Sequence, residues 1–250
     1  MNLYILILLA LRAQFIGFAP LLLLFGLILV LFIVALLRAA KQRAGRRQAA
    51  LELGFTPVLD SSRPSLRRIS AFYDRVGATY SIQNVFWQAG KEFDLYSYDL
   101  RLSTGRRPAV YYSLALVSPG LRLPSFAIVT PSGNDGMMAR MAQGVAAGVF
   151  AFSGQFPINI SSDPEFARHY MVVGADENAI KMSLNGHILD WFVKLREESG
   201  MRLLQIIVED GLIIWSWREN RSFDSPDQVQ NLRVSKERLM TLYQMLREKG

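Results

Sequence analysis

The hydrophobic pattern of the chain changes near residue 38. Residues 15–37, FIGFAPLLLLFGLILVLFIVALL, are apolar on every side of a helix and contain no charged group. About 20 such residues cross the hydrocarbon core of a bilayer, whereas the surface helix of a soluble protein keeps a polar face. We therefore predict a transmembrane helix over residues 15–37.

Residues 1–14 are also apolar, but they are too few to cross a bilayer alone. The stretch MNLYILILLAL runs into Arg12 and Gln14. We assign it as an interfacial N-terminus, which either lies flat or extends the main helix with Arg12 reaching the headgroups. A cleaved signal peptide is the competing interpretation, but the chain lacks a basic start and its apolar stretch is too long.

A basic segment follows the apolar one. Residues 38–54 are rich in Ala, Arg, Gln and Leu and end at Gly54, which predicts a juxtamembrane helix. Its bases, which we expect to lie against anionic headgroups, are Arg38, Lys41, Arg43, Arg46 and Arg47. Only Arg12 precedes the apolar segment. This asymmetry predicts a single pass through the inner (cytoplasmic) membrane, with the N-terminus outside and the C-terminal domain in the cytoplasm.

From residue 55 to residue 250 the pattern is that of a soluble domain. A short helix is predicted over Ser65–Arg75. Four segments rich in aromatic and β-branched residues follow, with short turns between them: Thr79–Gln88, Glu92–Leu102, Ala109–Ser118 and Ser125–Thr130. Such short turns join antiparallel neighbours, so we predict a four-stranded meander with a bulge near Leu95.

The second half of the domain mixes helices with a hairpin. We predict a helix start at residues 162–165, a strand near His169–Val173 and a helical region from Asp176 to about Glu198. A hairpin should turn at Asp210-Gly211, and a long helix should begin at Ser225. The glycine-containing stretch Met137–Phe152 is too polar for a second pass and should pack on the sheet. The order predicts an α+β fold, a mainly antiparallel sheet covered by helices.

Net charge excludes one class of partner. The chain carries +7, but residues 48–250 account for only +1, because six bases and no acid precede them. A nucleic-acid-binding domain needs a basic face, so we expect no nucleic-acid partner.

The residues that usually carry chemistry are scarce. There is no cysteine, and the two histidines, His169 and His187, lack a second ligand at metal-binding spacing. Glu92 and Asp94 fall on one face of a strand and Asp99 on the other, as solvated acids of a hairpin. We expect no metal, no cofactor and no enzymatic activity.

Aromatic side chains exceed what one face of a meander can bury. We predict that some form a strip that contacts headgroups or a protein partner. The candidates are Trp87, Tyr96, Tyr98, Trp215 and Trp217.

Three stretches resemble one group of proteins. SPGLRLPSFAIVTPSG, DPEFARHYMVVGADENAI and IIVEDGLIIWSWRE are similar to segments of a poorly characterised bacterial family with one N-terminal membrane helix and a cytoplasmic α+β domain. The resemblance covers residues 38–247 and implies no activity.

Together these patterns favour a non-catalytic accessory or scaffolding subunit of a larger membrane complex, such as a respiratory or photosynthetic one. Its expected partners are the lipid bilayer and integral membrane subunits. The alternative is a membrane-tethered ligand-binding or hydrolytic domain that uses serine and carboxylate side chains in a cleft.

Overall fold

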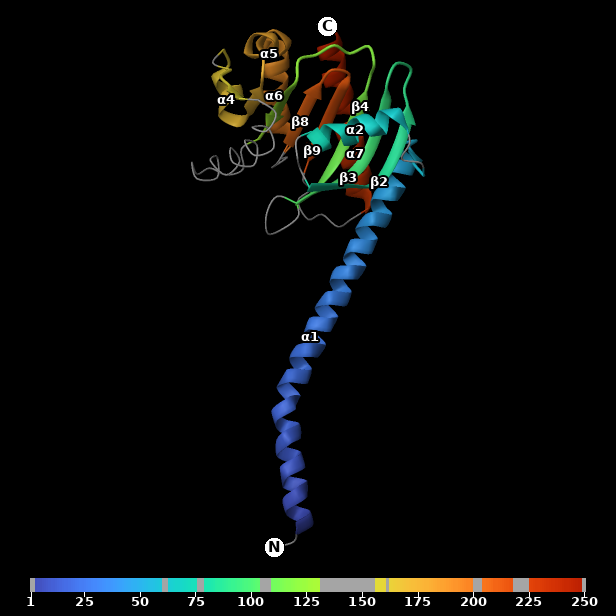
Figure 1. Cartoon of the computed structure of the whole chain (residues 1–250), viewed down its shortest axis with the longest axis vertical. Coiled ribbons are helices and arrows are strands. Elements are labelled where there is room, and N and C mark those ends of the chain that lie inside the picture. The colour runs from blue at the N-terminus through green and yellow to red at the C-terminus, as the bar shows by residue number, and fades with distance from the viewer. Residues whose placement is uncertain are drawn as a thin grey trace.

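A large antiparallel sheet with helices on both faces forms the domain, and one long helix projects from it (Figure 1). The computed structural model describes residues 3–59, 63–75, 79–103, 109–130, 156–160, 162–199, 204–217 and 225–248. The fold is α+β, as the sequence predicts.

The described elements have the following bounds. The helices are α1 (Leu3–Glu52), α2 (Pro64–Arg75), α4 (Pro164–His169), α5 (Glu177–Ser183), α6 (Gly186–Ser199) and α7 (Ser225–Arg247). The strands are β1 (Thr56–Pro57), β2 (Thr79–Ala89), β3 (Asp94–Ser103), β4 (Ala109–Val117), β5 (Phe126–Val129), β6 (Phe156–Ile158), β7 (Met171–Gly174), β8 (Leu204–Glu209) and β9 (Leu212–Trp217). The stretch Met137–Phe152 lies outside the described residues.

The strands lie in the order β1-β2-β3-β4-β9-β8-β5-β7-β6, and every described pair is antiparallel. The predicted meander is therefore right for β2, β3 and β4 but wrong for β5. The late β8–β9 hairpin lies between β4 and β5, with Leu114 opposite Trp215. Residues 118–125 can make this crossing, because eight extended residues reach about 26 Å and three strand spacings need only about 14 Å.

The predicted bulge exists, but in the neighbouring strand. The register between β2 and β3 shifts between Gln83 and Phe86, and Asn84 there adopts a φ of +50°. In β3, side chains alternate without interruption from Leu95 onward, so no bulge is needed at Leu95. The extra residue in β2 brings Phe86 to the opposite face of the sheet from Ile82.

Two helix predictions also need correction. His169 ends α4 instead of lying in a strand, and the strand begins at Met171. The single helical region predicted from Asp176 is two helices, because the side chain of Asn185 accepts a hydrogen bond from the Ile188 N–H and starts a new helix.

The two faces of the sheet carry separate apolar clusters. On one face, α4, α6, α7 and the last turns of α1 pack against the sheet around the buried Trp215. On the other face, α2 covers the first strands with Ile69 and Phe72. The predicted β8–β9 hairpin and the predicted long helix from Ser225 are both confirmed, and Leu239 and Leu246 of α7 are fully buried.

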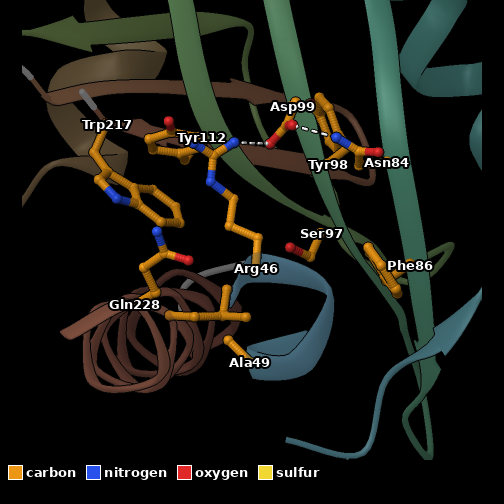
Figure 2. A pocket seen from close by; sticks show the side chains of 11 residues that line it. Arg46, Ala49, Asn84, Phe86, Ser97, Tyr98, Asp99, Tyr112, Trp217 and Gln228 are labelled. Atoms are coloured by element: carbon orange, nitrogen blue, oxygen red, sulfur yellow. Dashed lines mark hydrogen bonds and ion pairs between the residues drawn. The ribbon is translucent and has the colours of Figure 1, made fainter. Parts of the chain in front are cut away.

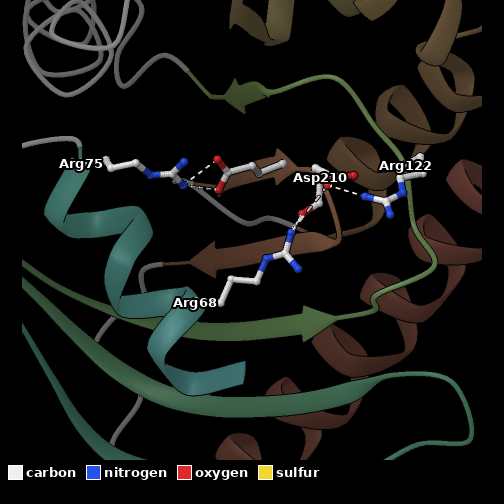
Figure 3. Close-up of polar contacts among 5 residues, drawn as sticks. Arg68, Arg75, Arg122 and Asp210 are labelled. Carbon is white, nitrogen blue, oxygen red and sulfur yellow. Dashed lines mark hydrogen bonds and ion pairs between the residues drawn. The ribbon is translucent and has the colours of Figure 1, made fainter. Parts of the chain in front are cut away.

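Arginines hold α2 against the β8–β9 turn (Figure 3). Arg68 donates to the backbone carbonyl of Asp210, and Arg75 pairs with Glu209 at 2.6 Å. From the loop after β4, Arg122 pairs with the Asp210 carboxylate at 2.8 Å. The turn is thus fixed from two sides.

Gly211 is the position in this turn that tolerates no side chain. Its φ is +67°, and a Cβ there would lie 2.8 Å from the backbone oxygen of Ser118. We expect Gly211→Ala to lower the free energy of unfolding by about 1–3 kcal/mol, measured by urea denaturation of the full chain in detergent. Gly120→Ala is the matched control, since a Cβ at Gly120 meets no atom within 4 Å, and it should change stability by less than about 0.5 kcal/mol. Equal effects of the two substitutions would contradict this account of the turn.

Candidate functional site

The junction between α1 and the domain is the candidate site. Residues 3–52 form one unbroken helix, so the first residues extend the main helix and the predicted transmembrane and juxtamembrane helices are continuous. Among the described residues, one helix, over Leu23–Glu52, is long and apolar enough to cross a membrane. Its apolar side chains from Leu23 to Leu37 are exposed, whereas Ala49 and Ala50 are buried in the domain.

The helix ends where the sequence predicts, at a glycine. Gly54 has a φ of +80°, and its N–H donates to the Leu51 carbonyl at 3.0 Å. The Phe55 N–H donates to the Ala50 carbonyl at 2.9 Å. This pair of bonds is the Schellman arrangement, in which the residue after the glycine packs back on the last turn. Phe55 is accordingly buried, and the chain turns directly from α1 into the sheet.

α1 and α7 run side by side in the same direction at this junction. Gly45 of α1 lies beside Gln228 of α7. One turn further along both helices, Ala49 and Leu232 line the same junction. A Cβ at Gly45 would lie 2.5 Å from the side-chain oxygen of Gln228, so the small residue allows the close approach. Trp217, at the end of β9, lines the same junction.

Arg46 connects α1 to the sheet through a buried ion pair (Figure 2). One of its terminal nitrogens lies 2.6 Å from the Asp99 carboxylate of β3, and its guanidinium stacks 3.3 Å from the centre of the Tyr112 ring of β4. The second Asp99 oxygen accepts a hydrogen bond from the Asn84 amide at 2.6 Å. Asn84 is the bulge residue of β2, so the irregularity in the strand supplies a donor to the carboxylate.

A second polar connection joins α7, β2 and the C-terminal end of α1. The Lys236 ammonium of α7 donates to the Gln88 side-chain oxygen of β2 at 2.7 Å. The Gln88 nitrogen donates to the Leu53 carbonyl, just past the end of α1, at 3.2 Å. Partial burial lowers the pKa of Lys236 below its usual value. Arg46 and Leu53 lie seven positions, about two helical turns, apart along the chain, so the two connections fix the last part of α1 at two levels.

The structure corrects one of the five predicted membrane-surface residues. Arg38, Lys41, Arg43 and Arg47 are exposed on α1. Arg46 is not, because its position on the helix faces the sheet along with Gly45, Ala49 and Ala50. Its charge is therefore used inside the protein and is not available to headgroups.

The predicted aromatic strip is wrong for most of its members. Tyr96, Tyr98, Trp215 and Trp217 are at most 5% exposed. The prediction treated one face of the sheet as solvated, but helices cover both faces. Trp87 is half-buried; its indole donates to Asp94 at 3.1 Å and the Arg63 guanidinium lies 3.8 Å from its ring centre.

Two of the acids that the sequence analysis assigned to a solvated hairpin, Asp94 and Asp99, make structural contacts instead. Asp94 accepts from Ser65 of α2 at 2.6 Å, and Asp99 accepts from Arg46 on the opposite face. The sequence does predict that these two acids face opposite ways. It gives no sign that Asp99 would meet Arg46, which lies 53 positions earlier.

Groups able to do chemistry are not brought together in the described part of the chain. His169 lies 3.1 Å from Glu165, one turn earlier on the surface of α4, and His187 is exposed at the start of α6. Within those same ranges, no cluster of three or more His, Asp or Glu side chains could hold a metal ion.

The Arg46–Asp99 pair gives a direct prediction. Removing one partner of a buried ion pair leaves the other charge uncompensated, so Asp99→Ala should lower the free energy of unfolding by about 3–5 kcal/mol. Arg47→Ala, one position along the helix and exposed, should cost less than about 0.5 kcal/mol. The double variant Arg46→Ala/Asp99→Ala should lose less than the sum of the single losses. Additive effects in urea denaturation of the full chain would show that the pair does not couple.

Comparison with known proteins identifies no family. No family model matches the chain, and no curated protein matches it. Among solved structures, it is similar to the crystal structure of the mycobacterial trehalose monomycolate transport factor A, TtfA, with 9% sequence identity and a TM-score of 0.45. That alignment covers 80% of this chain and 95% of the TtfA chain. At this level the likeness carries no functional argument.

Proposed function

We propose that this chain is a non-catalytic accessory or scaffolding subunit of a larger membrane protein complex. The observation that carries the proposal is the continuity of α1. An apolar stretch, exposed from Leu23 to Leu37, continues without a break into turns that are buried in the domain. A helix of this kind holds its domain at one position and angle above a bilayer, whereas a flexible linker would not.

The height of the domain above the bilayer follows from helix geometry. Gly45, which lies against Gln228 of α7, comes eight positions after Leu37. At 1.5 Å per residue this places the domain about 12 Å beyond the apolar stretch. The interval carries the exposed Arg38, Lys41 and Arg43, whose charges favour an anionic surface. The domain would therefore stand close to the membrane surface, within reach of the extramembrane parts of a neighbouring subunit.

The side chains that could support catalysis are used structurally instead. The Asp99 carboxylate is neutralised by Arg46, and His169 pairs with Glu165 on an open surface. The Ser118 hydroxyl donates to the Glu92 carbonyl at 3.0 Å and lies 3.3 Å from the Tyr243 hydroxyl. These contacts favour a binding or positioning role over a hydrolytic one.

We expect the N-terminus outside and the domain in the cytoplasm, because the bases cluster after the apolar stretch. The chain contains no cysteine, so single cysteines report topology without interference. In intact cells, a membrane-impermeant maleimide should label Asn2→Cys and should not label Met182→Cys, a position that is 78% exposed on the domain. Labelling of Met182→Cys without permeabilisation would show that the domain lies outside, contrary to the prediction.

The accessory role predicts co-purification that depends on a rigid helix. After mild-detergent extraction, native-gel mass spectrometry should find the chain with integral membrane subunits. Inserting Gly-Ser-Gly-Ser after Arg43 should keep the protein in the membrane and folded, but reduce the co-purifying subunits by about tenfold or more. The same insertion after Pro119, in an exposed turn, is the control and should leave co-purification unchanged. Migration of the unmodified chain as a lone monomer would reject the proposal.

A further inference from the structure

A small cavity lies at the junction, between α1, α7 and the sheet (Figure 2). The centres of water-sized groups have about 30 Å³ to occupy, and the empty space around them, which includes open solvent at the mouth, is about 420 Å³. The walls are mostly apolar and include Ala49, Phe86 and Leu232, with the ring of Tyr112 beside them. Space of this size admits about two water-sized groups, so the rest of a longer ligand must extend into the open mouth.

Two buried side chains present unsatisfied polar atoms to this cavity. Gln228 is 3% exposed and Trp217 is 5% exposed. Within the described ranges, neither amide atom of Gln228 nor the indole N–H of Trp217 has a hydrogen-bond partner. Figure 2 shows the Gln228 amide beside the Trp217 ring. Because buried polar atoms are nearly always bonded, three such atoms in one place indicate a group that should complete them.

The two charges at the site cancel, which favours an uncharged ligand. Arg46 and Asp99 lie on the same wall, but they form a close ion pair and neutralise each other. An anion or cation that entered the cavity would lose its hydration and would meet no counter-charge, which is unfavourable. The remaining requirement is a group that accepts from an N–H and donates to the Gln228 carbonyl oxygen, and a hydroxyl group does both.

The ligand must also reach the cavity from water. Arg46 comes nine positions after Leu37, which places the cavity about 13 Å beyond the apolar stretch. The headgroup layer on each side of a bilayer is only about 5–8 Å thick. A lipid headgroup that stays in the bilayer therefore falls short of the cavity.

We propose that this cavity binds a small uncharged alcohol, whose hydroxyl group fills the inner space and bonds to Gln228 and Trp217, while its short apolar body extends along the apolar walls into the open mouth. The site does not require the proposed subunit role, since its walls come from α1, α7 and the sheet of this chain. It lies where α1 and α7 meet, so its occupant would contact both helices.

The experiment uses the full chain, labelled with ¹⁵N-tryptophan, in lipid nanodiscs. The four tryptophans give four indole N–H signals, and Trp217→Phe assigns the one from the cavity. Titration with 1-butanol should shift the Trp217 signal to saturation and leave the signal of Trp87, whose indole is already bonded to Asp94, in place. Methyl propyl ether, an isomer of 1-butanol that cannot donate, should bind about fivefold more weakly.

Gln228→Met keeps the size of the side chain but removes the amide, and it should weaken 1-butanol binding about tenfold. Unchanged Trp87 and Trp191 signals would show that this variant is folded. The proposal is overturned if all four signals shift in proportion to the alcohol concentration without saturating, because such shifts indicate that the alcohol only partitions into the lipid. It is also overturned if the ether binds as well as the alcohol, or if Gln228→Met binds 1-butanol as tightly as the unmodified chain.

Discussion

Arg46 brings a charge from the basic segment of α1 into the interior of the domain, where Asp99 meets it at 2.6 Å. A charged pair in such surroundings is stable only when its geometry is good and its remaining hydrogen-bonding groups are satisfied. Asn84 contributes to that condition by donating to the second carboxylate oxygen, and the Tyr112 ring stacks against the guanidinium. The bulge in β2 supports the ion pair, because it places Asn84 on the face of the sheet that α1 occupies.

The position of Arg46 also fixes the rotation of α1 about its own axis. Gly45, Ala49 and Ala50 must face the domain when Arg46 does, and their small size lets the helix approach α7 and the sheet closely. The remaining bases, from Arg38 to Arg47, then point into solvent. Helix rotation thus places Arg46 against the domain and leaves Lys41, Arg43 and Arg47 exposed on the outer side of α1.

The sequence predicts the parts of the fold that depend on local signals. The apolar stretch, the end of α1 at Gly54, the hairpin at Asp210-Gly211 and the long helix from Ser225 are all found. Contacts between distant segments could not be predicted in the same way. The insertion of β9 beside β4 depends on packing across about 100 residues, and the burial of Trp215 and Trp217 depends on helices that cover both faces of the sheet. The Arg46–Asp99 pair belongs to this second group, since each residue alone has the pattern of a solvated charge.

The apolar helix α1 and the domain should form one rigid unit. Pulsed electron paramagnetic resonance tests it most directly, with one spin label at Lys41→Cys on α1 and another at Met182→Cys on α5, both exposed positions in a chain that has no other cysteine. A rigid junction predicts a single narrow distribution of distances between the labels in lipid nanodiscs. A broad distribution, as for two bodies joined by a flexible linker, would contradict it.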